Sequence, residues 1–258
     1  MNHQPFAPAE ADEPTRGGPS PRALATTARG TLVLLRHGRT PWNDEFRFTG
    51  WAEPSLSERG AAEAVRAGDA IASCGLNVST VITSLATRAL ETATIALSGA
   101  QGLAWRVDWR LNERHFGLLQ GLDREAAIGR YGKASVRRWK RDRDAVPPAI
   151  PEHDLRHPRH DARYADVAPE HLPGAESIAD HEGRIGACWA DTIDPLLEQG
   201  ADVLVVAHCH SLRALTRLVT TTDGGATTAL FADTGSVVIA SGSGVLRELE
   251  IAGLPATA

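Results

Sequence analysis

The sequence is poor in the features that mark several classes of protein. Its three cysteines are odd in number and scattered along 258 residues, which argues against a disulfide framework. No apolar run approaches the roughly 20 residues needed to cross a bilayer. The formal net charge of -5 gives no general attraction to nucleic acid or to an anionic membrane. We therefore expect a cytoplasmic protein without a membrane or nucleic-acid partner.

The first 29 residues also lack the pattern of a folded segment. They are rich in proline, alanine and glycine, and they contain no apolar stretch of the kind found in a signal peptide. Glu10, Asp12 and Glu13 argue against a transit peptide. We predict that residues 1–29 form a disordered tail and that residues 30–253 form one folded catalytic domain.

Short apolar runs alternate with amphipathic segments through the rest of the chain. Strands are predicted at 32–35, 78–83, 105–107 and 202–207, a terminal hairpin at 236–240 and 245–250, and helices at 57–73, 86–97, 176–197 and from 211 onward. Pro195 is expected to kink the third of these helices. Proline-rich residues 146–173 are predicted to form an irregular insertion over the core. The alternation predicts a three-layer α/β fold, with helices on both faces of a mostly parallel sheet.

Two of the predicted strands end in histidine motifs. Arg36-His37-Gly38 follows the first strand, and His208-Cys209-His210 follows the strand at 202–207. In open α/β sheets, ligands bind beyond the carboxyl ends of the strands. One histidine at such a place is more often structural, but two strand ends of similar composition favour a functional site. Arg88, at the start of a helix, is placed to join them.

These residue types suit phosphoryl transfer. A neutral imidazole such as His37 is a good nucleophile at phosphorus, and a phosphohistidine divides the transfer into two easier steps. Arg36 and Arg88 offer planar, charged forks to phosphate oxygens, and His208 offers a further donor. Gly38 is expected to let the phosphate approach the backbone. Glu113 is the candidate general acid and base, and no metal is required.

Other residues of the sequence admit more than one interpretation. The histidines and aspartates at 153–161 include metal-ligand types, but their proline-rich context gives no regular geometry, and we predict no metal site. Cys209 is interpreted as a small buried residue in preference to a reactive thiol. The basic residues Arg114, Lys140, Arg141 and Arg143 could form a solvated face or hold a ligand.

Several segments carry a resemblance to a known family: LVLLRHGRTPWN, FRFTGW, TSLATRALETA, RLNERHFGLLQGL, ARYADV and AHCHSLRAL. They resemble the cofactor-dependent phosphoglycerate mutases of the histidine phosphatase superfamily, from about residue 32 to residue 249. The resemblance implies a phosphoglycerate-mutase-like fold for residues 30–253. It also implies interconversion of 3- and 2-phosphoglycerate through a phosphohistidine primed by 2,3-bisphosphoglycerate.

The resemblance leaves other functions open. One is a histidine-type phosphatase, or a mutase-like enzyme that acts on another small phosphorylated acid. Another is a catalytically silent binding module, which the presence of Arg36, His37, Arg88, Glu113 and His208 disfavours. A homo-oligomer is compatible with the sequence.

The resemblance also implies roles for individual residues. His37 would be phosphorylated, Glu113 would donate and accept the proton, and Arg36, Arg88 and His208 would bind the phosphate. The remaining substrate-binding residues would be Gly38, Asn43, Thr49, Gly50, Arg114, Arg124, Lys140, Arg141, Cys209 and His210.

The sequence departs from the mutase pattern outside the transfer machinery. Phe116 replaces a tyrosine, Arg124 a lysine and Lys140 an arginine, while Cys209-His210 stands where the family has Gly-Asn. The departures alter the residues expected to recognise the substrate.

Overall fold

A central sheet organises the molecule. The computed structural model describes residues 28–220, 230–240 and 246–249. Within them lies a six-stranded sheet of order β3-β2-β4-β1-β5-β6. The strands are β1 (Leu32–Arg36), β2 (Val78–Thr83), β3 (Ala104–Val107), β4 (Asp202–Ala207), β5 (Val237–Ala240) and β6 (Leu246–Glu248). The first four are parallel, and β5 and β6 form an antiparallel hairpin beside β1. The mostly parallel sheet is confirmed.

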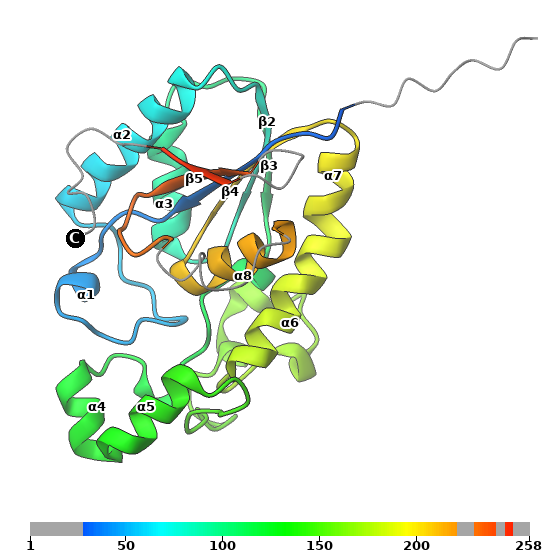
Figure 1. Ribbon diagram of the computed structural model, residues 1–258. Helices are drawn as coiled ribbons and strands as arrows, with labels where there is room; N and C mark the ends of the chain where they lie inside the picture. Colours follow the sequence, from blue (N-terminus) through cyan, green and yellow to red (C-terminus); the bar gives the residue numbers. More distant parts are fainter. Residues whose placement is uncertain (1–27, 221–229, 241–245, 250–258) are drawn as a thin grey trace, which may run out of the picture.

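Helices cover both faces of the sheet (Figure 1). One face packs against α2 (Glu58–Ser73) and α3 (Thr87–Ala96), and the other against α6 (Ile178–Cys188), α7 (Asp194–Glu198) and α8 (Cys209–Val219). Side chains alternate across a strand, so Leu32 and Leu34 pack toward α6–α8 while Val33 and Leu35 pack toward α2 and α3. This confirms the three layers.

The predicted helix at 176–197 is divided in the structure. It begins at Ile178, widens into a π-helical turn over 189–193, and continues as α7. Pro195 lies in the first turn of α7, where its missing N–H is tolerated. The following helix begins at Cys209, two residues earlier than predicted, with His208 as its N-cap.

A second group of helices lies away from the sheet. Helix α1 (Pro41–Asp44) follows β1, and α4 (Arg124–Tyr131) and α5 (Lys133–Arg141) form a pair beneath it (Figure 1). Gly132, at a φ of 81°, allows the sharp break between α4 and α5. Sequence patterning assigned no helix to this stretch, because Ala127 and Val136 are its only buried helical positions.

The proline-rich segment is irregular, as predicted. Three 3₁₀ turns occupy part of it, over 158–160, 162–164 and 169–171. Tyr164 stacks on Trp51 at a ring separation of 5.1 Å, and with Leu172 they form a small separate apolar cluster. Among the residues described, no helix is long and apolar enough to span a membrane. Residues 1–27 of the predicted tail and 250–253 of the predicted domain lie outside the described residues.

Candidate active site

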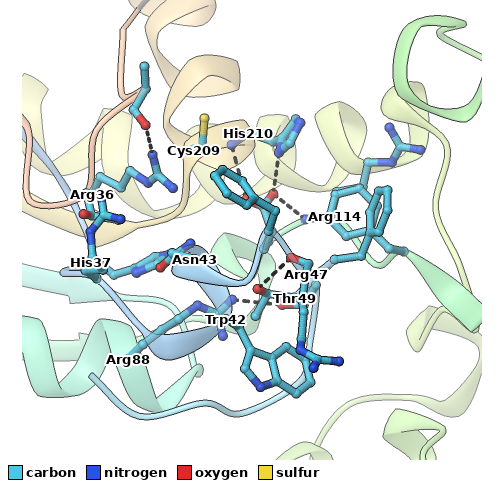
Figure 2. A pocket seen from close by; sticks show the side chains of 18 of the residues that line it. Arg36, His37, Trp42, Asn43, Arg47, Thr49, Arg88, Arg114, Cys209 and His210 are labelled. Atoms are coloured by element: carbon cyan, nitrogen blue, oxygen red, sulfur yellow. Dashed lines mark hydrogen bonds and ion pairs between the residues drawn. The ribbon is translucent and has the colours of Figure 1, made fainter. Parts of the chain in front are cut away.

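A cavity of about 650 Å³ opens at the carboxyl ends of β1 and β4 (Figure 2). Its lining includes Glu113 and Asp233 and eight basic side chains, which are Arg36, Arg39, Arg47, Arg88, Arg114, Arg124, Lys140 and Arg213. This surplus of positive charge stands in a chain of net charge -5, so the cavity is built for an anion.

His37 lies at the inner end of the cavity, directly after β1, and is 5% exposed. Its Nδ1 lies 2.7 Å from the carbonyl oxygen of Gly38. Because a carbonyl only accepts hydrogen bonds, Nδ1 carries the proton and Nε2 has a free lone pair. Burial, followed by the charges of Arg88 and Arg36, holds the pKa of His37 well below its ordinary value. His37 is therefore a neutral imidazole with Nε2 available as a nucleophile.

His208 stands beside His37 at the end of β4, with the ring centroids 5.1 Å apart. Its Nε2 lies 2.8 Å from Ser84 Oγ, while the buried Nδ1 has no hydrogen-bond partner among the residues that the structure describes. Burial, Arg88 and His37 hold the pKa of His208 well below its ordinary value. Ser84 follows β2 within the segment TSLATRALETA, but the sequence analysis assigned it no role.

Two arginines flank these histidines. Arg88 donates to the carbonyl oxygens of Gly50 and Ala52, both at 2.9 Å. Arg36 donates to the carbonyl oxygens of Phe231 and Ala232. Burial lowers the pKa of Arg88 to about 10, so its guanidinium remains charged at neutral pH. Within the described part of the chain, the Nε atoms of both arginines are buried without a hydrogen-bond partner, so each is a donor that an anion could use.

Gly38 is required for a reason other than the one predicted. A Cβ atom there would lie 2.3 Å from the carbonyl oxygen of Gly60, in the first turn of α2. The Gly38 N–H donates to Thr92 Oγ1 at 2.9 Å, and Gly38 does not line the cavity. The glycine therefore permits close packing of the motif on α2 and α3, and our expectation that it admits phosphate to the backbone is corrected.

Glu113 faces the same cavity from the loop after the 3₁₀ turn at 109–111, and it is 8% exposed. Its Oε1 accepts from the backbone N–H of Arg114 at 2.8 Å. Burial alone would raise the pKa of the carboxyl, but the contact with His210 holds it well below its ordinary value. The carboxylate is therefore ionised in the free site.

The loop that carries Glu113 is fastened by a group that sequence patterning missed. Arg184 on α6 pairs with Glu176 and donates to the carbonyl oxygens of Arg110, Asn112 and Glu113. Its guanidinium lies over the rings of Trp51 and Trp109, at 5.4 and 5.8 Å. Trp51 Nε1 also donates to the Glu113 carbonyl oxygen at 2.7 Å.

Most of the predicted substrate-binding residues line this cavity. Asn43, Thr49 and Gly50 come from the α1 region, Arg124 from α4 and Lys140 from α5. Asn43 also caps α1 by accepting from the Thr40 N–H at 2.9 Å. The side chain of Arg114 donates to the carbonyl oxygens of Trp139 and Glu176, so it ties α5 to α6.

Arg141 is separated from this group. It does not line the main cavity but borders a second hollow, of about 440 Å³, between α4 and α5. Cys209 does line the main cavity, and burial raises the pKa of its thiol, in keeping with a small packing residue. Figure 2 shows Cys209 and His210 on the same side of the cavity, across from Arg88.

The aspartates of the proline-rich segment are paired with arginines. Asp154 pairs with Arg156, and Asp161 pairs with Arg163. Within the described ranges, no group of three or more His, Cys, Asp or Glu side chains is arranged to hold a metal ion.

The family model of the histidine phosphatase superfamily (branch 1) matches residues 32–155 and 150–250. The chain belongs to this superfamily. It is 48% identical over 187 residues to a 2,3-bisphosphoglycerate-dependent phosphoglycerate mutase of Nitratidesulfovibrio vulgaris strain Hildenborough, covering 71% of this chain and 74% of that protein. A mutase of the same name from strain Miyazaki F is 43% identical over 222 residues, covering 85% and 89%.

Solved structures place the fold in the same superfamily. A mycobacterial glucosyl-3-phosphoglycerate phosphatase has a TM-score of 0.63 at 27% identity, covering 86% of this chain and 97% of that one. An Escherichia coli protein described as a putative alpha-ribazole-5'-P phosphatase has a TM-score of 0.66 at 21% identity, covering 89% and 100%. The second likeness concerns the fold alone.

Proposed function

We propose that the protein is a phosphoglycerate mutase that interconverts 3- and 2-phosphoglycerate through phospho-His37. The observation that carries the proposal is a neutral, buried imidazole with Nε2 free, between two arginines, inside a strongly basic cavity. The identity of 43–48% to proteins named as 2,3-bisphosphoglycerate-dependent mutases supports this choice of substrate.

The transfer follows from the geometry of the inner end. Nε2 of His37 attacks phosphorus, the N–P bond forms, and the P–O bond to the substrate breaks. Arg36 and Arg88 stabilise the charge on the transferring phosphoryl group, and the leaving oxygen takes a proton through Glu113. The free hydroxyl of an incoming 3-phosphoglycerate then attacks phospho-His37, the N–P bond breaks as the new O–P bond of 2,3-bisphosphoglycerate forms, and Glu113 removes the proton of that hydroxyl.

The outer end of the cavity would hold the remainder of the substrate. Arg124 and Lys140 supply positive charge there, suited to a carboxylate or to the second phosphate of 2,3-bisphosphoglycerate. That bisphosphate would supply the phosphoryl group that primes His37. The cavity fits it because cations line both ends, and two anionic groups need two such regions.

The direct test is to incubate the purified protein with 3-phosphoglycerate, with and without 2,3-bisphosphoglycerate. We expect 2-phosphoglycerate to form faster than inorganic phosphate, and the bisphosphate to increase that rate. H37N serves as the matched inactive control. Phosphate release that exceeds isomerisation would contradict the proposal.

A phosphatase is the second candidate. It is favoured by the 27% identity to a solved structure named as a glucosyl-3-phosphoglycerate phosphatase. The same assay separates the two candidates, because a phosphatase would release phosphate without forming 2-phosphoglycerate.

A further inference from the structure

Glu113 and His210 face each other at the wall of the cavity. His210 is the second residue of α8, and its Nδ1 lies 3.1 Å from Glu113 Oε1. The backbone N–H of His210 points toward Oε2 at 3.5 Å. The distance between Nδ1 and Oε1 is that of an ion pair, although the orientation of the imidazole ring does not meet the geometry of a hydrogen bond. This contact joins the proposed acid to a residue at which the sequence departs from the mutase pattern.

Positive and neutral groups surround Glu113 on every side. Arg36 faces it from β1, Arg88 from α3 and Arg114 from its own segment. His208 and His210 face it from the start of α8, and His181 from α6. These neighbouring positive charges explain why the Glu113 carboxyl is ionised although it is buried. An ionised carboxylate has no proton to give, so a proton for the leaving oxygen must be held nearby.

The three histidines around Glu113 differ in their exposure to water. His208 and His181 are buried, and burial holds the pKa of each well below its ordinary value. These two imidazoles are neutral. The side chain of His210 is 42% exposed. Solvated imidazoles take up a proton between about pH 5 and 8. Of the three, His210 is the one that combines contact with Glu113 and contact with water.

We propose that His210 is a proton-relay residue that holds the transferred proton and exchanges it with Glu113, an inference that rests on the proposed role of Glu113 as the acid. The proton passes from Nδ1 to the Glu113 carboxylate, and from there to the oxygen left when the P–O bond breaks. The pair is then a neutral imidazole and a carboxylate. The attack of the incoming hydroxyl on phospho-His37 returns the proton by the same path.

Phe116 holds His210 in this position. The two rings meet edge to face, 5.9 Å apart and inclined by 75°. Phe116 is in turn packed against Phe48, at 5.4 Å, and under the guanidinium of Arg114, at 5.3 Å. Phe116 and His210, which both depart from the mutase pattern, are thus in direct contact. The aromatic wall limits the rotation of the imidazole and keeps Nδ1 toward the carboxylate.

The experiment compares two substrates over pH in the intact protein. One is 3-phosphoglycerate, whose alkoxide leaving group needs a proton, and the other is p-nitrophenyl phosphate, whose leaving group does not. The readout is the ratio of the two rates, since pH effects on His37 and on phosphate binding are shared by both. The variants are H210N and H210Q, with H153N as a control for the loss of an exposed histidine remote from the cavity.

We expect H210N and H210Q to lower the ratio on the order of tenfold near neutral pH, within the range for a lost proton donor. We expect the ratio to recover as the pH falls and Glu113 itself becomes protonated. H153N should follow the wild type. A ratio in both His210 variants that matches the wild type at every pH would overturn the relay.

E113Q distinguishes the two proposals. A selective loss on 3-phosphoglycerate in E113Q, with no change of ratio in the His210 variants, would overturn the relay and leave Glu113 as the acid. An equal loss on both substrates in E113Q would overturn the role of Glu113 itself. Thermal melting of each variant shows whether it is folded. If H210N does not fold, the ratio of the two rates is taken from H210Q.

Discussion

The inner and outer ends of the cavity are built from different parts of the fold. The inner end consists of residues at the ends of β1 and β4 and at the start of α3, of which His37, Arg88 and His208 are buried and Arg36 is partly buried. The outer end comes from α4, α5 and the loop after α1, where the Phe46 side chain is 79% exposed. The inner end is held by the core and the outer end is not. We infer that the core determines the reaction and the outer helices determine the substrate.

The largest effect is expected at the nucleophile. H37N should lower turnover by about four orders of magnitude or more on every phosphate ester, because no other group at the inner end can form the covalent intermediate. Steady-state rates on 3-phosphoglycerate and p-nitrophenyl phosphate would measure this. If H37N kept the wild-type melting temperature and more than a few per cent of the activity, His37 would not be the nucleophile.

A smaller loss is expected at Arg88. R88K keeps the charge but loses the planar fork that donates to the Gly50 and Ala52 carbonyls. We expect kcat to fall about 100-fold, as for the loss of one donor to a transition state. KM and kcat measured separately provide the check. A change confined to KM would place Arg88 with the residues of the outer end.

At the outer end, the effect should appear in substrate binding. K140A removes one cation from the cavity wall, and KM for phosphoglycerate should rise about tenfold, the value of one charge-assisted hydrogen bond. R141A is the matched control, because Arg141 lies one residue away on the same helix but outside the main cavity. If R141A raises KM as much as K140A does, both basic residues bind the substrate, and the binding site extends beyond the main cavity.

The last expectation concerns stability, not catalysis, and it depends on the buried histidines. Burial lowers the pKa of His37, His181 and His208, and it lowers that of His115 to about 3. The unfolded chain binds protons at these histidines below about pH 6.5, whereas the folded chain does not. Acid therefore favours unfolding, by about 1.4 kcal/mol per histidine for each pH unit below that value.

Thermal melts at about pH 7.5 and about pH 5 test this expectation. We expect a lower melting temperature in acid, and a weaker pH dependence in H115Q. H153N, at an exposed position, should retain the pH dependence of the wild type. A melting temperature that is constant between these two pH values would contradict the neutrality of the buried histidines.

The inner end was more accessible to sequence analysis than the outer end, for a physical reason. β1 and β4 each contain an unbroken apolar run, at 32–35 and 203–207, and parallel strands place their carboxyl ends at one edge of a sheet. That rule alone brings His37 beside His208. Helices α4 and α5 bury so few side chains that no periodic pattern marks them.

Other features depend on contacts that leave no trace in local sequence. Arg184, on α6, contacts Glu176 and backbone carbonyl oxygens of the segment that leads to Glu113. Neither Arg184 nor Glu176 stands in a recognisable motif. The need for glycine at position 38 arises from Gly60, which only the packing of α2 reveals. The π-helical turn at 189–193 lies directly before the turn that contains Pro195, where the sequence predicted a kink but not its form.

The most direct test of the account is to identify the residue that carries the phosphoryl group. The protein would be incubated with 2,3-bisphosphoglycerate labelled in phosphorus, and the modified peptide sequenced under alkaline conditions that preserve phosphohistidine. We expect an acid-labile phosphoryl group on His37, lost in H37N and discharged by adding 3-phosphoglycerate. A label on His208 or Cys209, or a protein that turns over substrate without becoming labelled, would contradict the account.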